Sequence, residues 1–181
     1  MDELSKLGKK YGTDKIGKHN YLPVYYEMFK DKRNEVEKVL EIGVAEGAGL
    51  FMFRDFFPNA TIYGLEIDIE RVRLFKDEPR TAVWQGDQSD KKDLETAIDI
   101  FGNDLDLVVD DGSHNPGDQV FTALTLLPLL KKGVIYVIED VANLDIFMQL
   151  VDEEILNRCD FRMVKVGDRY DDRLIILTKR Q

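Results

Sequence analysis

Cysteine is nearly absent from this sequence, because Cys159 is the only one among 181 residues. A single cysteine excludes an intrachain disulfide and leaves a cysteine-based zinc site without its ligands. No stretch approaches the roughly 18 consecutive apolar residues of a membrane-spanning helix, and the first residues lack the apolar core of a secretory signal. We therefore expect a reduced, cytoplasmic protein without a membrane partner.

Basic residues are also scarce, since 25 Lys and Arg stand against 35 Asp and Glu, which gives a net charge of −10. Such a surface repels the phosphates of nucleic acids, so we do not expect a nucleic acid partner. The hydrophobic fraction of 44% is that of a globular protein rather than a disordered one. Length and composition together favour one globular domain.

Short apolar runs alternate with amphipathic stretches, which is the pattern of a parallel sheet covered by helices on both faces. Strands are expected at 39–43, 61–66, 81–85, 105–109 and 134–138, and helices at 50–57, 70–75, 93–101, 119–130 and 144–156. The last two apolar runs, 161–166 and 174–178, are joined by a short polar turn that suits an antiparallel hairpin. The sequence therefore predicts a three-layer, Rossmann-like α/β fold of the methyltransferase type, with a seven-stranded, mostly parallel sheet and a C-terminal antiparallel hairpin. Its domain would span 39–181, and residues 1–38 would form a cap segment over the active site.

The first predicted strand runs into a glycine-rich turn that contains Gly43, Gly47 and Gly49. Glycines at such a turn let a ligand lie against main-chain N–H groups at the start of the next helix. The spacing Gly-x3-Gly-x-Gly differs from the Gly-x-Gly-x2-Gly of dinucleotide sites, which favours a methyl donor that has no pyrophosphate. The alternative is a plain strand-to-helix turn.

The ends of the next strands carry further candidates for the donor site. Glu66 ends the second strand, where an acid accepts hydrogen bonds from a ribose diol, although it could instead cap the following helix, as Asp68 could. Asp87 and Gln88 follow the third strand and could contact the adenine. The residues expected at the donor are Gly43, Gly47, Glu66, Ile67, Asp87, Gln88, Asp110, Thr13 and Lys15.

Two pairs of acids follow the fourth and fifth strands, Asp110 with Asp111 and Glu139 with Asp140. Carboxylates at one edge of a sheet repel one another unless protons or a cation neutralise them, and their hard oxygens suit Mg²⁺, Mn²⁺ or Ca²⁺. His114 lies three positions after Asp111, close enough to take a proton from a hydroxyl held on such a cation. The alternative is that the acids cap helices and that His114 is a surface residue.

Five segments together resemble the metal-dependent sugar O-methyltransferases of macrolide biosynthesis and, less closely, the cephalosporin hydroxylase-like proteins. These segments are 41–43, 62–64, 86–90, 110–114 and 136–140. The resemblance implies S-adenosylmethionine as donor and a hydroxyl of a sugar or glycosylated small molecule as acceptor. It also implies Mg²⁺, or another divalent cation, on Asp111, Glu139 and Asp140, with His114 as the catalytic base.

Residues 11–15, with His19 and Tyr21, also resemble the segment that precedes the catalytic core in that family. We expect this part of the cap segment to cover the donor site, with Thr13 or Lys15 near the donor's carboxylate or the acceptor. Two other functions stay open at this point. An NAD-dependent oxidoreductase would share the glycine turn and Glu66, and a non-catalytic partner subunit with the same fold would bind the donor without turnover. A homo-oligomer is also left open.

Overall fold

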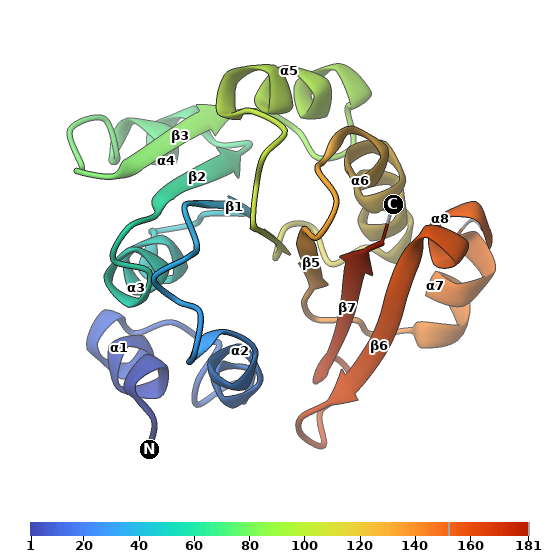
Figure 1. Ribbon diagram of the computed structural model, residues 1–181, viewed down its shortest axis with the longest axis horizontal. Coiled ribbons are helices and arrows are strands. Elements are labelled where there is room, and N and C mark those ends of the chain that lie inside the picture. Colours follow the sequence, from blue (N-terminus) through green and yellow to red (C-terminus); the bar gives the residue numbers. More distant parts are fainter. Residues whose placement is uncertain (152, 181) are drawn as a thin grey trace.

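Seven strands form one sheet in the computed structural model, which describes residues 1–151 and 153–180, and their order is β3-β2-β1-β4-β5-β7-β6. The strands are β1 Lys38–Ile42, β2 Thr61–Glu66, β3 Thr81–Gln85, β4 Leu107–Asp110, β5 Ile135–Ile138, β6 Cys159–Lys165 and β7 Arg173–Lys179. β1 to β5 are mutually parallel, whereas β7 is antiparallel to both of its neighbours. The predicted mostly parallel sheet with a terminal hairpin is confirmed (Figure 1).

Strand β1 lies between β2 and β4, with Ile42 opposite Leu65 on one side and opposite Asp110 on the other. From β1 the chain builds the sheet first to one side, through β2 and β3, and then to the other side, beginning with β4, so the strand order reverses between β1 and β4. In open α/β sheets the crevice outside the carboxyl ends of the strands at such a reversal is where ligands bind. The fold therefore places the binding site at the ends of β1, β2 and β4.

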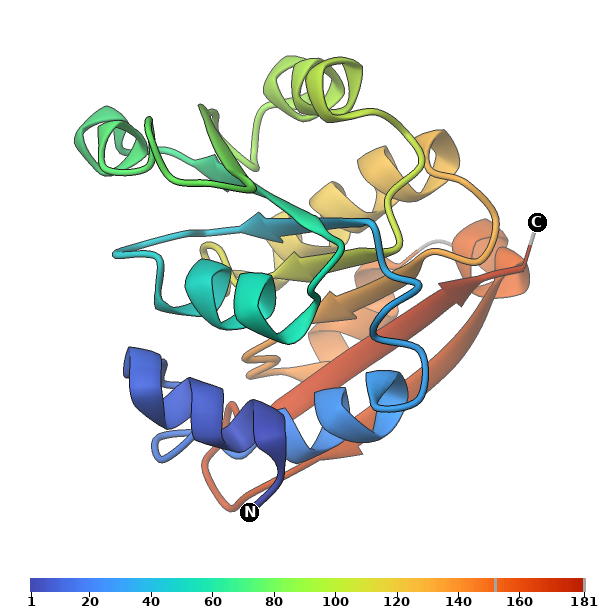
Figure 2. The same ribbon diagram turned by 60° about the vertical axis from the view of Figure 1, so that its left-hand side comes forward.

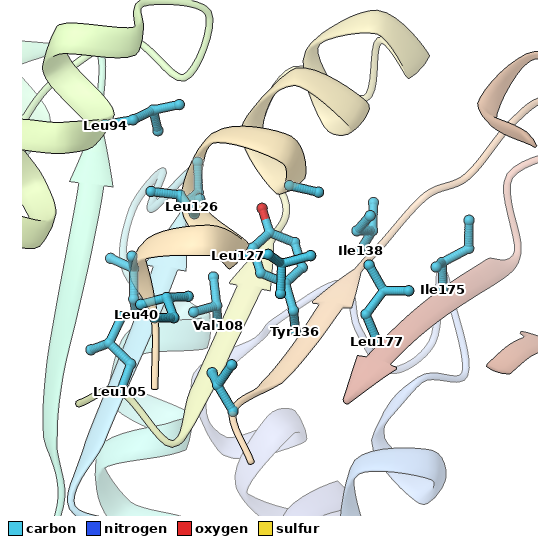
Figure 3. Close-up of a cluster of buried hydrophobic side chains, with 14 of the residues drawn as sticks. Leu40, Leu94, Leu105, Val108, Leu126, Leu127, Tyr136, Ile138, Ile175 and Leu177 are labelled. Carbon is cyan, nitrogen blue, oxygen red and sulfur yellow. The ribbon is translucent and has the colours of Figure 1, made fainter. Parts of the chain in front are cut away.

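Helices cover both faces of the sheet (Figure 2). Their bounds are α1 Glu3–Tyr11, α2 Leu22–Phe29, α3 Ala48–Phe56, α4 Ile69–Arg73, α5 Lys91–Phe101, α6 Pro116–Leu129, α7 Leu144–Leu150 and α8 Glu153–Arg158. One buried cluster joins α5, α6 and α7 to the sheet and includes Val108 and Tyr136 (Figure 3). A second cluster joins α1, α2 and α3 to the opposite face and includes Val109 and Val137. Neighbouring residues of a strand thus enter different layers, as the alternation of side chains in a strand requires.

The N-terminal segment is part of the second hydrophobic layer as well as a neighbour of the strand ends. Leu4 and Leu22 have no exposed surface, and Phe29 is 1% exposed. Their side chains share a core with Phe53 and Phe56 of α3. Burial of these large side chains anchors α1 and α2, each only eight or nine residues long, which would be too short to be stable alone.

One predicted helix, 144–156, is divided in the structure. Val151 takes an extended conformation (φ −68°, ψ 135°), so α7 ends at Leu150 and α8 begins at Glu153. Val151 is buried in the core layer of Phe147, and residue 152 lies outside the described residues. Among the residues that are described, no helix is both long and apolar enough to cross a membrane.

Candidate active site

A cavity of about 580 Å³ opens at the carboxyl ends of β1, β2 and β4. It is lined by the N-terminal segment, the glycine turn, the end of β2 and the turn after β4. The residues expected from the sequence that line it are Thr13, Lys15, Gly43, Glu66, Ile67, Asp87, Gln88, Asp111 and His114. Gly47, Asp110, Glu139 and Asp140 are outside its lining.

Gly43 and Gly47, both expected at the donor, have different roles in the structure. Gly43 has φ 81°, and a Cβ there would lie 2.2 Å from the carbonyl oxygen of Asp111. It therefore lets the end of β1 approach the turn after β4. Gly47 has φ 83° at the start of α3, and a Cβ there would meet the ring of Phe75 at 2.3 Å. Its role in the structure is to admit this packing rather than to face the cavity.

Glu66 is held against the glycine turn by the main chain. Its Oε2 accepts hydrogen bonds from the amides of Val44 at 3.0 Å and Ala45 at 2.9 Å, and its Oε1 accepts one from the amide of Asp68 at 3.0 Å. A carboxylate offers about four lone-pair sites, so acceptor capacity is left beside the cavity. The carboxylate is thus fixed in place before any ligand arrives.

Asp110, which is expected at the donor, is buried and lies outside the lining of the cavity. Side chains alternate along a strand, so Asp110 faces the layer of α6 while Asp111 faces the other side of the sheet. Burial raises the pKa of Asp110 to about 7. Gln88 donates from Nε2 to Asp110 Oδ1 and Thr122 Oγ1, both at 3.2 Å, and its Oε1 accepts from the amide of Ser113 at 2.6 Å. The amide of Gln88 therefore holds the turn after β4 in place.

Asp87 lines the cavity but also makes a local turn. Its Oδ1 accepts from the amide of Ser89 at 2.8 Å and from the hydroxyl of the same residue at 2.7 Å. Its own amide donates to Asp93 Oδ2 at 2.9 Å. At the end of β3, Asp87 thus stabilises a local turn and also lies beside the cavity.

A buried ammonium group lies among three carboxylates at the inner end of the cavity. Lys15 Nζ is 2.5 Å from Asp111 Oδ2, 2.8 Å from Glu139 Oε2 and 3.4 Å from Glu41 Oε1. Burial raises the pKa of Glu41 to about 7 and also raises that of Glu139. Burial acts in the same direction on Asp111, but the charge of Lys15 and the hydrogen bond from His114 outweigh it and lower its pKa. Lys15, expected beside the donor or the acceptor, lines the cavity and also neutralises part of the acidic cluster.

His114 bridges two of the predicted metal ligands. Its Nε2 lies 3.1 Å from Asp111 Oδ1, and its Nδ1 lies 3.5 Å from Asp140 Oδ2. Both His114 (φ 58°) and Asp140 (φ 53°) have left-handed backbone conformations, which non-glycine residues adopt mainly where their surroundings impose them. The hydrogen bond with Asp111 raises the pKa of His114 to about 8.

The donor set of this edge suits a hard divalent cation. Asp111, His114 and Asp140 each offer a ligand atom, and these atoms lie within 4.8 Å of one another. Glu139 is turned inward, where its Oε1 accepts from the hydroxyl of Tyr25 at 2.5 Å and its Oε2 faces Lys15. The carboxylate oxygens of Asp111 and Asp140 are the kind of ligand that Mg²⁺ and Mn²⁺ prefer. The ligand set Asp111, Glu139 and Asp140 stays a prediction.

Sequence reasoning missed two participants in this cluster. Glu41 is a buried charged residue between apolar neighbours in β1, and that mismatch is a signal that could have identified it. Tyr25 gives no such signal, because an aromatic residue in a short amphipathic helix is ordinarily core. Only its spacing of four residues from Tyr21 relates it to the site.

Comparison with known proteins gives a consistent set of matches. A family model described as a methyltransferase domain matches residues 40–141. Mycinamicin VI 2''-O-methyltransferase of Micromonospora griseorubida is 39% identical over 146 residues, which cover 76% of this chain and 36% of the relative. The 8-demethyl-8-alpha-L-rhamnosyl tetracenomycin-C 2'-O-methyltransferase of Streptomyces olivaceus is 37% identical over 145 residues, which cover 76% of this chain and 37% of the relative. The chain thus matches little more than a third of the length of these relatives.

Solved structures agree with the sequence matches. The MycE methyltransferase of the mycinamycin biosynthetic pathway, solved in complex with Mg and SAH, superposes with a TM-score of 0.77 at 30% identity, covering 99% of this chain and 55% of that one. The fibrillarin pre-rRNA processing protein of Methanococcus jannaschii superposes with a TM-score of 0.58 at 17% identity, covering 82% of this chain and 68% of that one. The second match shows the shared fold alone.

Proposed function

This chain belongs to the methyltransferase domain family, and on that premise we propose that it transfers the methyl group of S-adenosylmethionine to a sugar hydroxyl of a small molecule with the help of a divalent cation. One observation carries the proposal. A single cavity is lined both by the glycine turn with Glu66 and by Asp111 with His114. A donor and an acceptor can therefore meet in it. The MycE methyltransferase, which superposes on 99% of this chain, holds Mg and SAH.

On the donor side, the chain has to bind and orient a reagent that is already activated. The sulfonium carbon carries its own leaving group, so the protein's contribution is alignment for an in-line attack. We assign the ribose hydroxyls to Glu66, whose carboxylate is fixed by the amides of Val44 and Ala45. The positive φ of Gly43 allows the main chain to turn closely around the ligand.

On the acceptor side, the chain has to remove a proton from a hydroxyl. Asp111, Glu139 and Asp140 would hold the cation, which when bound supplies Lewis-acid polarisation of an oxygen. His114, whose side chain is 39% exposed at the cavity wall, would take the proton. It must be neutral to do so, and its hydrogen bond with Asp111 favours the protonated form. A cation bound to Asp111 would weaken this effect and favour the neutral form of His114.

The acceptor class rests on the relatives. Those compared are named as 2''-O- and 2'-O-methyltransferases of glycosylated compounds, and MycE was also solved with Mg, SAH and mycinamycin VI. The net charge of −10 supports a small molecule over a nucleic acid as acceptor. We accordingly propose a hydroxyl of a sugar, free or attached to a larger small molecule.

The oxidoreductase alternative loses support from the placement of two residues. Tyr11 and Lys15 are four positions apart, the spacing of a Tyr-x3-Lys proton-transfer pair. The Tyr11 hydroxyl lies 2.5 Å from Asp55 Oδ2, whereas the Lys15 ammonium is buried among Asp111 and Glu139. The hydroxyl of Tyr11 and the ammonium group of Lys15 thus contact different partners and do not form a proton-transfer pair.

The proposal is tested by ligand binding followed by product analysis. S-adenosylmethionine and S-adenosylhomocysteine should raise the melting temperature, and NAD should not. Incubation with the donor, Mg²⁺ and a panel of glycosides should add one methyl group to a sugar oxygen, as seen by mass spectrometry. Stabilisation by NAD alone would contradict the class of enzyme. Tight donor binding without methylation of any glycoside would favour the non-catalytic partner subunit.

A further inference from the structure

Two buried tyrosines of the N-terminal segment meet the two adjacent acids after β5. The Tyr21 hydroxyl donates to Asp140 Oδ1 at 2.5 Å, and the Tyr25 hydroxyl donates to Glu139 Oε1 at 2.5 Å. Tyr21 is 1% exposed and Tyr25 has no exposed surface. Hydrogen bonds from a hydroxyl to a carboxylate at this distance belong to the strong, charge-assisted kind. Tyr21 and Tyr25, four positions apart at the start of α2, thus donate hydrogen bonds to two adjacent acids that follow β5.

The contact with Tyr21 determines which oxygen of Asp140 faces the cavity side. Because Oδ1 is held by the hydroxyl, Oδ2 is directed toward His114, whose Nδ1 lies 3.5 Å away. The same hydroxyl accepts a hydrogen bond from the Asp140 amide at 3.3 Å. Side chain and main chain of Asp140 are therefore fixed by one group, at a residue whose φ of 53° needs such support.

The contact with Tyr25 holds one carboxylate oxygen of Glu139, Oε1, in place. Glu139 is 1% exposed, and its other oxygen faces Lys15 at 2.8 Å. An accepted hydrogen bond leaves lone pairs on each carboxylate oxygen, so a cation can still be bound. Without the hydroxyl, Oε1 would be a buried acceptor that lacks its partner.

Both tyrosines are themselves immobilised. The ring of Tyr25 packs edge-on against Phe53, with centroids 5.5 Å apart. The ring of Tyr21 stacks on His19 at 4.9 Å, and His19 Nδ1 is 2.8 Å from Asp172 Oδ1 in the turn between β6 and β7. Burial raises the pKa of both tyrosines well above its ordinary value, so each stays an O–H donor.

We propose that Tyr21 and Tyr25 are positioning residues of the cation site, which orient Asp140 and Glu139 for a divalent cation. This inference rests on the proposed function, since it takes these carboxylates as the ligands. Groups behind the ligands of a metal fix their orientation, and their loss typically weakens metal binding by about 10–100-fold. The N-terminal segment thus contributes to the cation site from behind the carboxylates as well as lining the donor cavity.

The test compares three substitutions of the same type in one segment. Tyr21→Phe and Tyr25→Phe remove a hydroxyl from the carboxylates, whereas Tyr26→Phe alters a partly buried tyrosine that packs near Phe56 and serves as the matched control. Mn²⁺ affinity is measured by electron paramagnetic resonance of the free ion, and S-adenosylhomocysteine affinity by calorimetry. We expect Tyr21→Phe and Tyr25→Phe each to weaken Mn²⁺ binding by about 10–100-fold. Donor affinity should stay unchanged, and Tyr26→Phe should match the parent chain.

Two contrary results are distinguishable. If the parent chain binds Mn²⁺ and both variants bind it equally well, the positioning role is wrong while the proposed function stands. If the parent chain binds no Mn²⁺ even with S-adenosylhomocysteine present, the cation site itself is wrong, and the inference fails with it. A turnover assay adds an independent criterion, because the activity of Tyr21→Phe should recover as Mg²⁺ is raised. A general loss of structure would lower activity at every Mg²⁺ concentration and would contradict the positioning role.

Discussion

Lys15 Nζ lies 2.5 Å from Asp111 Oδ2, a contact between residues 96 positions apart in the chain. It places a protein-borne positive charge within the acidic cluster at the end of β4. The other oxygen of Asp111 faces His114 at 3.1 Å. Asp111 is thus shared between a permanent cation on its inner side and the histidine on its cavity side. This arrangement explains how several acids can be buried at one sheet edge, since an unpaired carboxylate there would be costly.

Replacement of Lys15 by methionine should destabilise the folded chain strongly. Removal of one partner of a buried charged group leaves the other charges uncompensated, which typically costs about 3–5 kcal/mol. Urea unfolding at neutral pH measures the difference in free energy of unfolding. Lys10→Met is the matched control, because Lys10 is an exposed lysine of the same segment that pairs with Asp55, and it should leave the stability unchanged. A Lys15→Met chain as stable as the parent would show that the ammonium contributes nothing net.

Glu66→Ala should weaken binding of both S-adenosylmethionine and S-adenosylhomocysteine by about 1–3 kcal/mol, through lost hydrogen bonds to the ribose. Glu66 also accepts hydrogen bonds from the amides of Val44 and Ala45, so Glu66→Gln is needed as a second, less disruptive variant. Calorimetry gives the dissociation constants, with the exposed Glu70→Ala as control. Equal donor affinity in the parent and both Glu66 variants would remove the carboxylate from the donor site.

His114 should titrate near pH 8 in the chain without added metal, because its hydrogen bond with Asp111 raises its pKa from 6.5 to about 8. A histidine pKa that is raised on folding contributes stability fully below the unfolded value of about 6.5, and this contribution is lost as pH rises through about 8. Imidazole chemical shifts give the pKa directly. Unfolding at about pH 6 and about pH 9 should show that His114→Gln removes this part of the pH dependence. An unshifted imidazole titration would contradict the contact with Asp111.

The general arrangement of the site could be predicted because parallel strands bring their carboxyl ends to one edge. Gly43 and Glu66 end predicted strands, Asp111 and His114 follow one, and the structure gathers all four around one cavity. It is harder to predict which face of the sheet a side chain occupies when the strand is apolar and buried on both sides. Asp110 was therefore expected at the donor, although it lies on the face opposite to Asp111.

The contacts of the N-terminal segment could not be predicted from local patterns. Lys15 and Tyr25 meet acids more than 90 positions away, and no periodicity in the segment indicates which strand end each will face. The same holds for the division of the helix at Val151, where apolar spacing continues across the break. Such features depend on tertiary packing, which overrides local propensity.

Metal binding and proton removal should be separable by mutation. His114→Ala should keep Mn²⁺ affinity but lose about 10²–10⁴-fold in rate, the usual contribution of a general base. That loss should shrink as pH rises, because more of the acceptor hydroxyl ionises without help. Asp111→Asn should instead lose Mn²⁺ binding while donor affinity survives. If His114→Ala abolishes Mn²⁺ binding, then His114 is a ligand, as its position within 4.8 Å of the ligand atoms of Asp111 and Asp140 would allow.

The most direct test of the proposed metal-assisted mechanism is methyl transfer from labelled S-adenosylmethionine to a glycoside by protein that has been treated with a chelator. Labelled product should disappear on chelation and return with Mg²⁺, while S-adenosylhomocysteine should bind equally in both states. Undiminished turnover by the chelator-treated chain would show that the carboxylates after β4 and β5 are structural, and it would contradict the proposed mechanism.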